Sequence, residues 1–122
     1  MAEHSAIDLD ALRRLLRAMG GEMDDLKDLF DSFVEDTPPL FVTMRTAAEN
    51  ADWEAFRRAA HTAKGAARDF GASDMAKICA ALEHEAATGP VADAFQRVAD
   101  VEAAFAAACG ALKSLLNGGG LA

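Results

Sequence analysis

The sequence predicts an all-α fold, an antiparallel up-and-down four-helix bundle with a short N-terminal capping helix over one end. The chain is rich in Ala, Leu, Asp and Glu, has few β-branched residues and contains no Tyr, which favours helices over strands. Apolar residues recur every three or four positions along most of the chain. Because the connections between these segments are short, antiparallel packing of neighbouring helices is the economical arrangement.

Two helices are predicted in the first part of the chain. Residues 7–19 carry leucines at helical spacing and are followed by a pair of glycines, which predicts a short first helix. Residues 23–49 continue the helical pattern, but Pro38 and Pro39 interrupt it. Proline lacks a backbone donor and clashes with the preceding turn, so we expect a kink or a break near Thr37.

The third predicted helix has the most regular apolar spacing. Asp52 is its expected N-cap, and the helix runs to about residue 70. Three small residues in the middle of its apolar stripe would let a neighbouring helix approach closely. The stripe consists of Trp53, Phe56, Ala60, Ala63, Ala67 and Phe70.

Two more helices complete the predicted bundle. Gly71 ends the third helix and Ser73 is the expected cap of the fourth, which Gly89-Pro90 stops. The last helix is predicted over about residues 91–117. Its apolar positions are Phe95, Val98, Val101, Phe105, Ala108, Leu112 and Leu115.

Length and apolar content indicate one domain. A chain of 122 residues suits a single hydrophobic core, so we expect one domain over residues 1–122, with a helical body at about 7–117 and a flexible tail at 118–122. No stretch approaches the roughly 20 consecutive apolar residues of a membrane span, and the first nine residues do not resemble a secretory signal. We therefore expect a cytoplasmic protein without membrane contact. We expect a monomer, because the predicted bundle closes within one chain.

Charge and residue spacing exclude several classes of function. The net charge of −8 and the pI near 4.7 argue against nucleic-acid binding, because phosphates would repel such a surface. Cys79 and Cys109 lack CxxC spacing, so buried reduced thiols are expected rather than a disulfide or a zinc site. The histidines are His4, in an expected flexible end, His61 and His84, and none is paired at helical ligand spacing, so no metal or haem site is predicted.

The residues around His61 give the clearest indication of a functional site. His61 follows Ala60 of the apolar stripe, so its side chain should border the core and reach solvent. A histidine among four cations in an acidic chain indicates a site for an anion. A glycine inside a helix costs about 1 kcal/mol relative to alanine, so Gly65 indicates that something approaches the helix there. The residues three, four and seven positions from His61, on its face of the helix, are Arg57, Arg58, Lys64, Gly65 and Arg68.

The same residues also have ordinary structural interpretations. Taken alone, His61 would be a half-buried surface histidine, and Lys64 would be a solvated charge. Arg57 and Arg58 can pair with Glu54 one turn earlier on the helix. It is the combination of these residues that favours a functional site.

Residues 60–83 resemble the histidine-containing phosphotransfer (HPt) domains. The motif of that family reads approximately H-T-L-K-G-S/A-A, followed by a leucine-glycine-alanine-like turn and a leucine-glutamate pair. Ala63 replaces a larger apolar residue of the motif, and Asp69 stands where a neutral residue is more common. The matching residues are His61, Thr62, Lys64, Gly65, Ala66, Phe70-Gly71-Ala72 and Leu82-Glu83.

The resemblance implies that His61 carries a phosphoryl group between the aspartates of response-regulator receiver domains, without kinase or hydrolase activity of its own. The receiver would bring the acidic pocket and magnesium, so no cofactor is expected on this chain, and a hybrid histidine kinase is a further candidate partner. Lys64 would pair with the phosphoryl oxygens, and Gly65 would clear the path for the receiver. The expected docking residues are Arg57, Arg58 and Arg68.

Glu83 is the expected orienting partner of His61. It lies twenty-two positions later, and an antiparallel helix pair joined at Gly71 brings the two residues level. A carboxylate bonded to Nδ1 would leave the lone pair of Nε2 as the nucleophile. A plain surface acid is the alternative for Glu83. The alternative function for the whole chain is a non-phosphorylated adaptor or dimerisation module that regulates a signalling partner by contact.

Overall fold

The computed structural model describes residues 7–118, so His4 and residues 119–122 of the expected tail lie outside the described range. Between residues 7 and 118 there is no β-strand, only an isolated antiparallel bridge between Ile7 and Ala72. The predicted all-α class is therefore confirmed. The helices are α2 (Leu9–Ala18), α3 (Met23–Asp36), α4 (Pro38–Glu49), α5 (Trp53–Asp69), α6 (Ser73–Thr88) and α7 (Ala94–Gly118).

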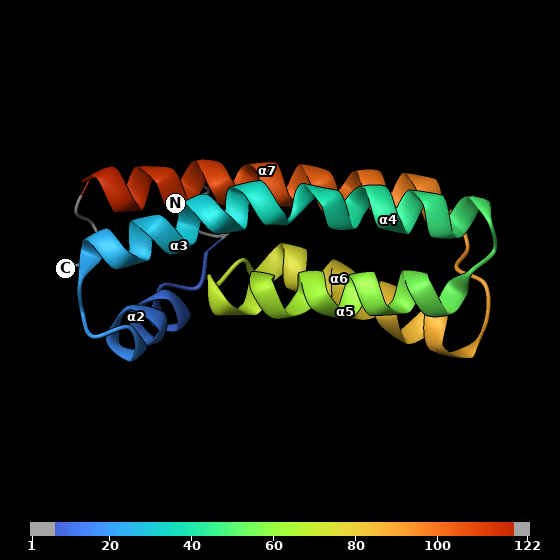
Figure 1. The fold of residues 1–122 in the computed structure, drawn as a ribbon, viewed down its shortest axis with the longest axis horizontal. Coiled ribbons are helices and arrows are strands. Elements are labelled where there is room, and N and C mark those ends of the chain that lie inside the picture. Colours follow the sequence, from blue (N-terminus) through green and yellow to red (C-terminus); the bar gives the residue numbers. More distant parts are fainter. Residues whose placement is uncertain (1–6, 119–122) are drawn as a thin grey trace.

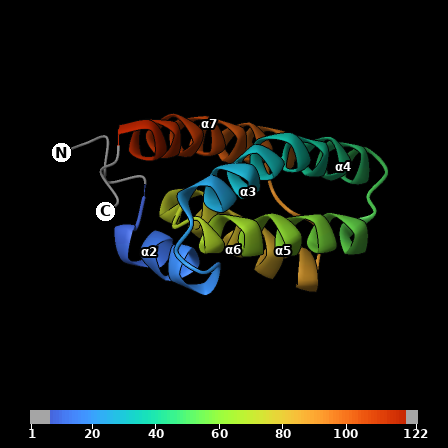
Figure 2. The same ribbon diagram turned by 60° about the vertical axis from the view of Figure 1, so that its left-hand side comes forward.

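The helices form two layers of a bundle (Figure 1). One layer contains α7 beside the consecutive helices α3 and α4, and the other contains the antiparallel pair α5 and α6. The most extensive helix packing is between α5 and α6, followed by α4 against α5. The short helix α2 lies at one end of the α5–α6 layer and packs on α5, as Figure 2 also shows. The predicted up-and-down bundle with a capping helix is confirmed.

The helices α3 and α4 together form the first rod of the bundle. This rod is divided at Thr37, as the two prolines predict. Thr37 is buried and keeps helical backbone angles, with φ −78° and ψ −44°. Pro38 and Pro39 occupy the first positions of α4, where a backbone N–H would have no acceptor within the helix. The chain therefore starts a new helix at Pro38 and continues along the same side of the bundle.

The core explains why α5 and α6 lie so close together. The stripe residues Ala60, Ala63 and Ala67 of α5 are fully buried, and their small side chains permit close helix approach. On α6, Met75 and Leu82 are equally buried. His61 follows Ala60 and Glu83 follows Leu82 in the sequence. This packing therefore fixes the position of His61 on α5 relative to Glu83 on α6.

A short segment before α2, Ile7 and Asp8, holds this helix against the turn between α5 and α6, and we call it the strap. The Asp8 N–H donates to the Gly71 carbonyl at 2.6 Å, and Asp8 Oδ1 caps α2 by accepting from the N–H groups of Asp10 and Ala11. Gly71 has φ +73°, and a Cβ at this position would lie 2.4 Å from the Asp8 carbonyl oxygen. The turn therefore requires glycine for both its conformation and its contact.

Two local predictions are wrong. Ser73 is the first residue of α6 rather than its cap; the cap position is Ala72, and the Ser73 hydroxyl donates instead to the Gly71 carbonyl at 3.4 Å. The last helix begins at Ala94, and Phe95 is 50% exposed rather than part of the core. Ala94 and the later core position Val98 face inward, which turns Phe95, one residue on from Ala94, toward solvent.

Candidate functional site

His61 lies on the outer side of α5. Its side chain is 63% exposed, whereas the adjacent stripe residues Ala60 and Ala63 are fully buried. The helix is fixed at its start by Asp52, whose side chain accepts from the Ala55 N–H at 3.1 Å. The imidazole thus borders the core and reaches solvent, as the sequence predicts.

Glu83 of α6 contacts this imidazole. Its Oε2 lies 2.8 Å from His61 Nδ1, and its side chain is only 18% exposed. The pKa of Glu83 is lowered, first by the paired ammonium of Lys64 and then by the hydrogen bond from His61, so the carboxylate is ionised at neutral pH. An ionised carboxylate only accepts hydrogen bonds, so Nδ1 must carry the proton, and in the neutral ring the lone pair belongs to Nε2.

Lys64 approaches the other oxygen of the same carboxylate. Its Nζ lies 2.6 Å from Glu83 Oε1, and its side chain is 17% exposed. The sequence places Lys64 on the face of His61, but its ammonium group is paired with Glu83 in the structure. Glu83 therefore bridges Lys64 and His61, and the three side chains form one charged cluster across α5 and α6.

Gly65 leaves the surface open beside this cluster. A Cβ built on Gly65 would meet no atom within 4 Å, and the residue is exposed in the middle of α5. The packing of the described residues therefore gives no reason for a glycine here. The absent side chain leaves room next to His61 for an approaching surface.

The arginines near His61 differ in how they are engaged. Arg57 forms a two-point contact with Glu54, at 2.9 Å from Nε and 2.7 Å from Nη2, and Arg58 reaches the same carboxylate at 3.3 Å. Arg57, more than Arg58, lowers the pKa of Glu54 to about 2. The pairing considered as an alternative is thus present, while Arg68 is exposed at the rim of a hollow between α2, α5 and α6.

A shallow hollow beside His61 was missed by sequence reasoning. It lies between the first rod and α5, has a volume of about 270 Å³, and is lined in part by Leu29, Leu40 and Thr62. Leu29 is 37% exposed. Leu29 comes directly before Phe30, which belongs to the buried apolar stripe of α3, so Leu29 itself lies outside that stripe. A leucine outside the stripe was the sequence feature that could have indicated an exposed apolar surface here.

Residues 7–118 contain no cluster of three or more His, Cys, Asp or Glu side chains placed to hold a metal ion. Both cysteines are free thiols, Cys79 buried and Cys109 half-buried. Burial raises their pKa values to about 12 and about 11, so both thiols stay protonated at neutral pH. None of the helices in this part of the chain is long and apolar enough to cross a membrane.

Comparisons with known proteins identify the family of the chain. The Hpt domain family matches residues 28–117. The crystal structure of histidine-containing phosphotransfer protein B (HptB) from Pseudomonas aeruginosa PAO1 is similar, with a TM-score of 0.81 and 28% sequence identity, over 92% of this chain and 95% of HptB. A comparison with curated protein sequences finds no significant match. Because the family match spans well over half of its length, the chain belongs to the Hpt domain family, the histidine phosphotransfer modules of phosphorelay signalling.

Proposed function

We propose that this chain is a phosphorelay intermediate in which Nε2 of His61 accepts a phosphoryl group from the phosphoaspartate of one receiver domain and gives it to the aspartate of another. One observation carries the proposal: the imidazole is exposed, and Glu83 binds Nδ1 at 2.8 Å, so Nε2 holds the available lone pair. The match to the Hpt family and the similarity to HptB support the same chemistry.

The transfer step uses this arrangement directly. The Nε2 lone pair forms a bond to phosphorus while the bond between phosphorus and the aspartate oxygen breaks, and the electron pair leaves on the aspartate. The ring gains positive charge as Nε2 bonds. The Nδ1–H remains bonded to the ionised Glu83 carboxylate, which stabilises this charge. Transfer to a second aspartate reverses the step and restores the neutral ring.

Lys64 acts in two ways in this proposal. In the unphosphorylated chain it pairs with Glu83, which favours the ionised carboxylate and limits its motion. When Nε2 carries a phosphoryl group, a second anion lies on the same face of α5, and the Lys64 ammonium reduces the repulsion between that anion and Glu83. We propose that this shared counter-charge is how Lys64 supports the phosphoryl group.

The receiver partner supplies the remaining parts of the reaction. We propose that its acidic pocket and magnesium meet His61 across the opening at Gly65, with Leu29 and Leu40 as an apolar contact beside the site. The cations Arg57, Arg58 and Arg68 would attract the acidic receiver surface, Arg68 most directly because Glu54 engages the other two. This chain then needs no cofactor and no kinase or hydrolase activity of its own, and a hybrid histidine kinase is a further partner.

Incubation with phosphorylated receiver domains tests the proposal. Wild-type protein and the variant His84→Gln, which changes another exposed histidine of the described chain, should acquire phosphate that is lost in acid and retained in base. The variant His61→Gln should acquire none. Phosphate on His61→Gln would contradict the assignment of the acceptor. Absence of phosphate on the wild type with every receiver of the same cell would instead favour the adaptor that acts by contact alone.

A further inference from the structure

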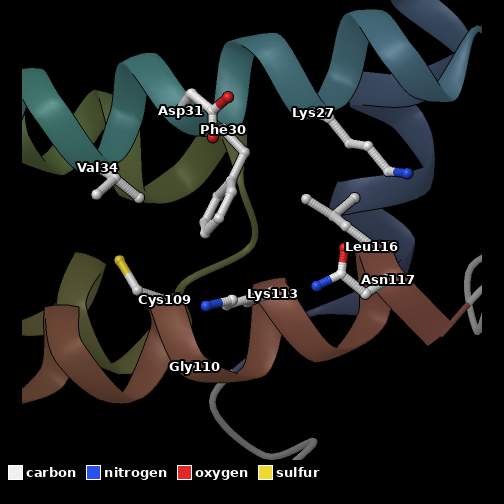
Figure 3. A pocket seen from close by; sticks show the side chains of 9 residues that line it. All are labelled: Lys27, Phe30, Asp31, Val34, Cys109, Gly110, Lys113, Leu116 and Asn117. Atoms are coloured by element: carbon white, nitrogen blue, oxygen red, sulfur yellow. The ribbon is translucent and has the colours of Figure 1, made fainter.

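A larger hollow lies between α3 and α7, and Figure 3 shows the side chains that line it. These two helices are in the layer opposite α5 and α6, which carry His61 and Glu83 (Figure 1). The volume of the hollow is about 500 Å³, which lies within the roughly 300–1,000 Å³ of small-molecule sites in proteins. Its walls come from residues 27–34 of α3 and residues 109–117 of α7. The proposed phosphotransfer chemistry makes no use of this space.

The interior of this α3–α7 hollow is apolar. Phe30 extends from α3 toward α7, and Leu116 and Cys109 extend from α7 toward α3 (Figure 3). Val34 also lines the hollow and is exposed to solvent. Burial raises the pKa of Cys109 to about 11, which fits a poorly hydrated wall.

Gly110 places no side chain on the α7 wall of the hollow. It lies in the middle of a long helix, and a Cβ at this position would meet no atom within 4 Å. The described packing therefore does not require a glycine, although glycine inside a helix costs about 1 kcal/mol relative to alanine. Gly65 has the same two properties beside His61. Gly110 also lines the α3–α7 hollow, so its missing side chain leaves space at that wall.

The rim of the hollow is cationic in a chain whose net charge is −8. Lys27 on α3 and Lys113 on α7 are two of only four lysines in the sequence. Asp31 is the one acid among the described lining residues, so the lining carries a net positive charge. An apolar interior with a cationic rim complements a ligand that has an apolar body and an anionic head.

We propose that the α3–α7 hollow is a binding site for a small amphiphilic organic anion, whose apolar body enters over Gly110 and whose anionic head lies between Lys27 and Lys113. The positive lining distinguishes this ligand from a neutral hydrophobic molecule. It also argues against a second copy of this chain as the occupant, because each lining carries a net positive charge and two such linings would repel each other.

Binding of 8-anilinonaphthalene-1-sulfonate to the full chain tests the proposal, with its neutral analogue N-phenyl-1-naphthylamine as the matched probe. Fluorescence titration should give saturable binding of one sulfonate probe per chain, and the neutral analogue should bind at least about tenfold more weakly. Shifts in amide NMR signals on sulfonate binding should be confined to α3 and α7. Sedimentation should show a monomer at the same protein concentrations.

Two variants change the hollow in different ways. Lys27→Gln with Lys113→Gln should weaken sulfonate binding about tenfold, because both rim charges are removed, while Lys77→Gln on α6 should leave it within about twofold. Gly110→Leu fills the space at the α7 wall and should abolish binding, with circular dichroism confirming that α7 is retained. Unchanged binding in Gly110→Leu or in the double lysine variant, equal binding of the neutral probe, or a dimer that Gly110→Leu dissociates would overturn the proposal.

Discussion

Lys64 and Glu83 form an ion pair of 2.6 Å across α5 and α6, and the same carboxylate bonds Nδ1 of His61 through its other oxygen. Lys64 therefore acts on the imidazole through Glu83 in the unphosphorylated chain. This relationship makes the effects of the two residues separable, because only Glu83 contacts the ring directly.

Replacing Lys64 tests its part in this cluster. Lys64→Gln removes the charge beside Glu83 and beside the future phosphoryl group, so the rate of transfer from a phosphorylated receiver should fall about tenfold. Lys64→Arg keeps the charge and should recover part of the rate. Lys77→Gln, which removes an exposed lysine of α6, is the matched control and should transfer normally. A wild-type rate in Lys64→Gln would remove Lys64 from the mechanism.

Replacing Glu83 should have the larger effect. Glu83→Ala frees the imidazole to rotate and to adopt the other tautomer, and loss of orientation on this scale slows a reaction by on the order of a hundredfold. Glu83→Gln keeps a hydrogen-bonding group but loses the charge, so its transfer rate should be intermediate. The matched control is Glu85→Ala on the same helix, whose carboxylate pairs with Arg97 instead. Equal rates in Glu83→Ala and Glu85→Ala would leave Glu83 as an ordinary surface acid.

The lowered pKa of Glu83 also predicts a pH dependence of stability. Lys64, and to a lesser extent His61, holds the pKa of Glu83 below its ordinary value of 4.5 in the folded chain. The carboxylate therefore stabilises the fold above pH 4.5, and this contribution is lost as the pH falls through the lower folded pKa. The melting temperature of the wild type relative to Glu83→Gln should be highest near neutral pH and should decline below pH 4.5.

Comparing the two proteins isolates Glu83, because the other paired acids of the described chain are the same in both. A difference in melting temperature that stays constant or grows between pH 4.5 and pH 3 would contradict the predicted sign. The shared acids with lowered pKa values are Glu54, Glu85 and Glu102.

Helical periodicity was sufficient to predict the bundle and the neighbourhood of His61. The stripe through Ala60 and Ala63 determines which side of α5 is buried, and it therefore determines that His61 is exposed. The prolines at 38 and 39 placed the break in the first rod for an equally local reason. The turn at Gly71 then brought Glu83 level with His61.

Details that depend on side-chain choice could not be predicted in this way. Helical spacing places Lys64 on the same face of α5 as His61. It does not predict that the flexible Lys64 side chain forms an ion pair with Glu83 on the next helix. Periodicity also grouped Phe95 with the apolar stripe of the last helix, because residues 94 and 95 both fit helical spacing to Val98. In the structure Ala94 is the buried one and Phe95 faces solvent. The hollows beside Leu29 and Gly110 depend on how separate helices diverge, which the pattern of one helix does not contain.

Gly71→Ala tests the strap that holds α2. Alanine at φ +73° is strained, and its Cβ would lie 2.4 Å from the Asp8 carbonyl oxygen, so the variant should lose about 2–3 kcal/mol of stability. Its melting temperature should then fall by more than about 5 °C. Gly21→Ala is the matched control, because Gly21 also has positive φ, at +82°, but a Cβ there meets nothing within 4 Å. Equal losses in the two variants would mean that the contact with Asp8 has no stabilising role.

Gly65 offers a prediction in which stability and function change in opposite directions. Alanine or leucine at this position gains helix propensity and meets no atom of the chain within 4 Å of its Cβ, so the free energy of unfolding should rise by about 0.5–1 kcal/mol. The leucine side chain would nevertheless occupy the space through which the receiver must reach His61. The receiver concentration needed for half-maximal transfer should increase about tenfold in Gly65→Leu, and less in Gly65→Ala.

Gly110→Ala and Gly110→Leu make the same changes in the other layer of the bundle, so they should gain similar stability and transfer at the wild-type rate. Normal transfer in Gly65→Leu, measured with the same receiver, would show that the partner does not approach His61 across this opening.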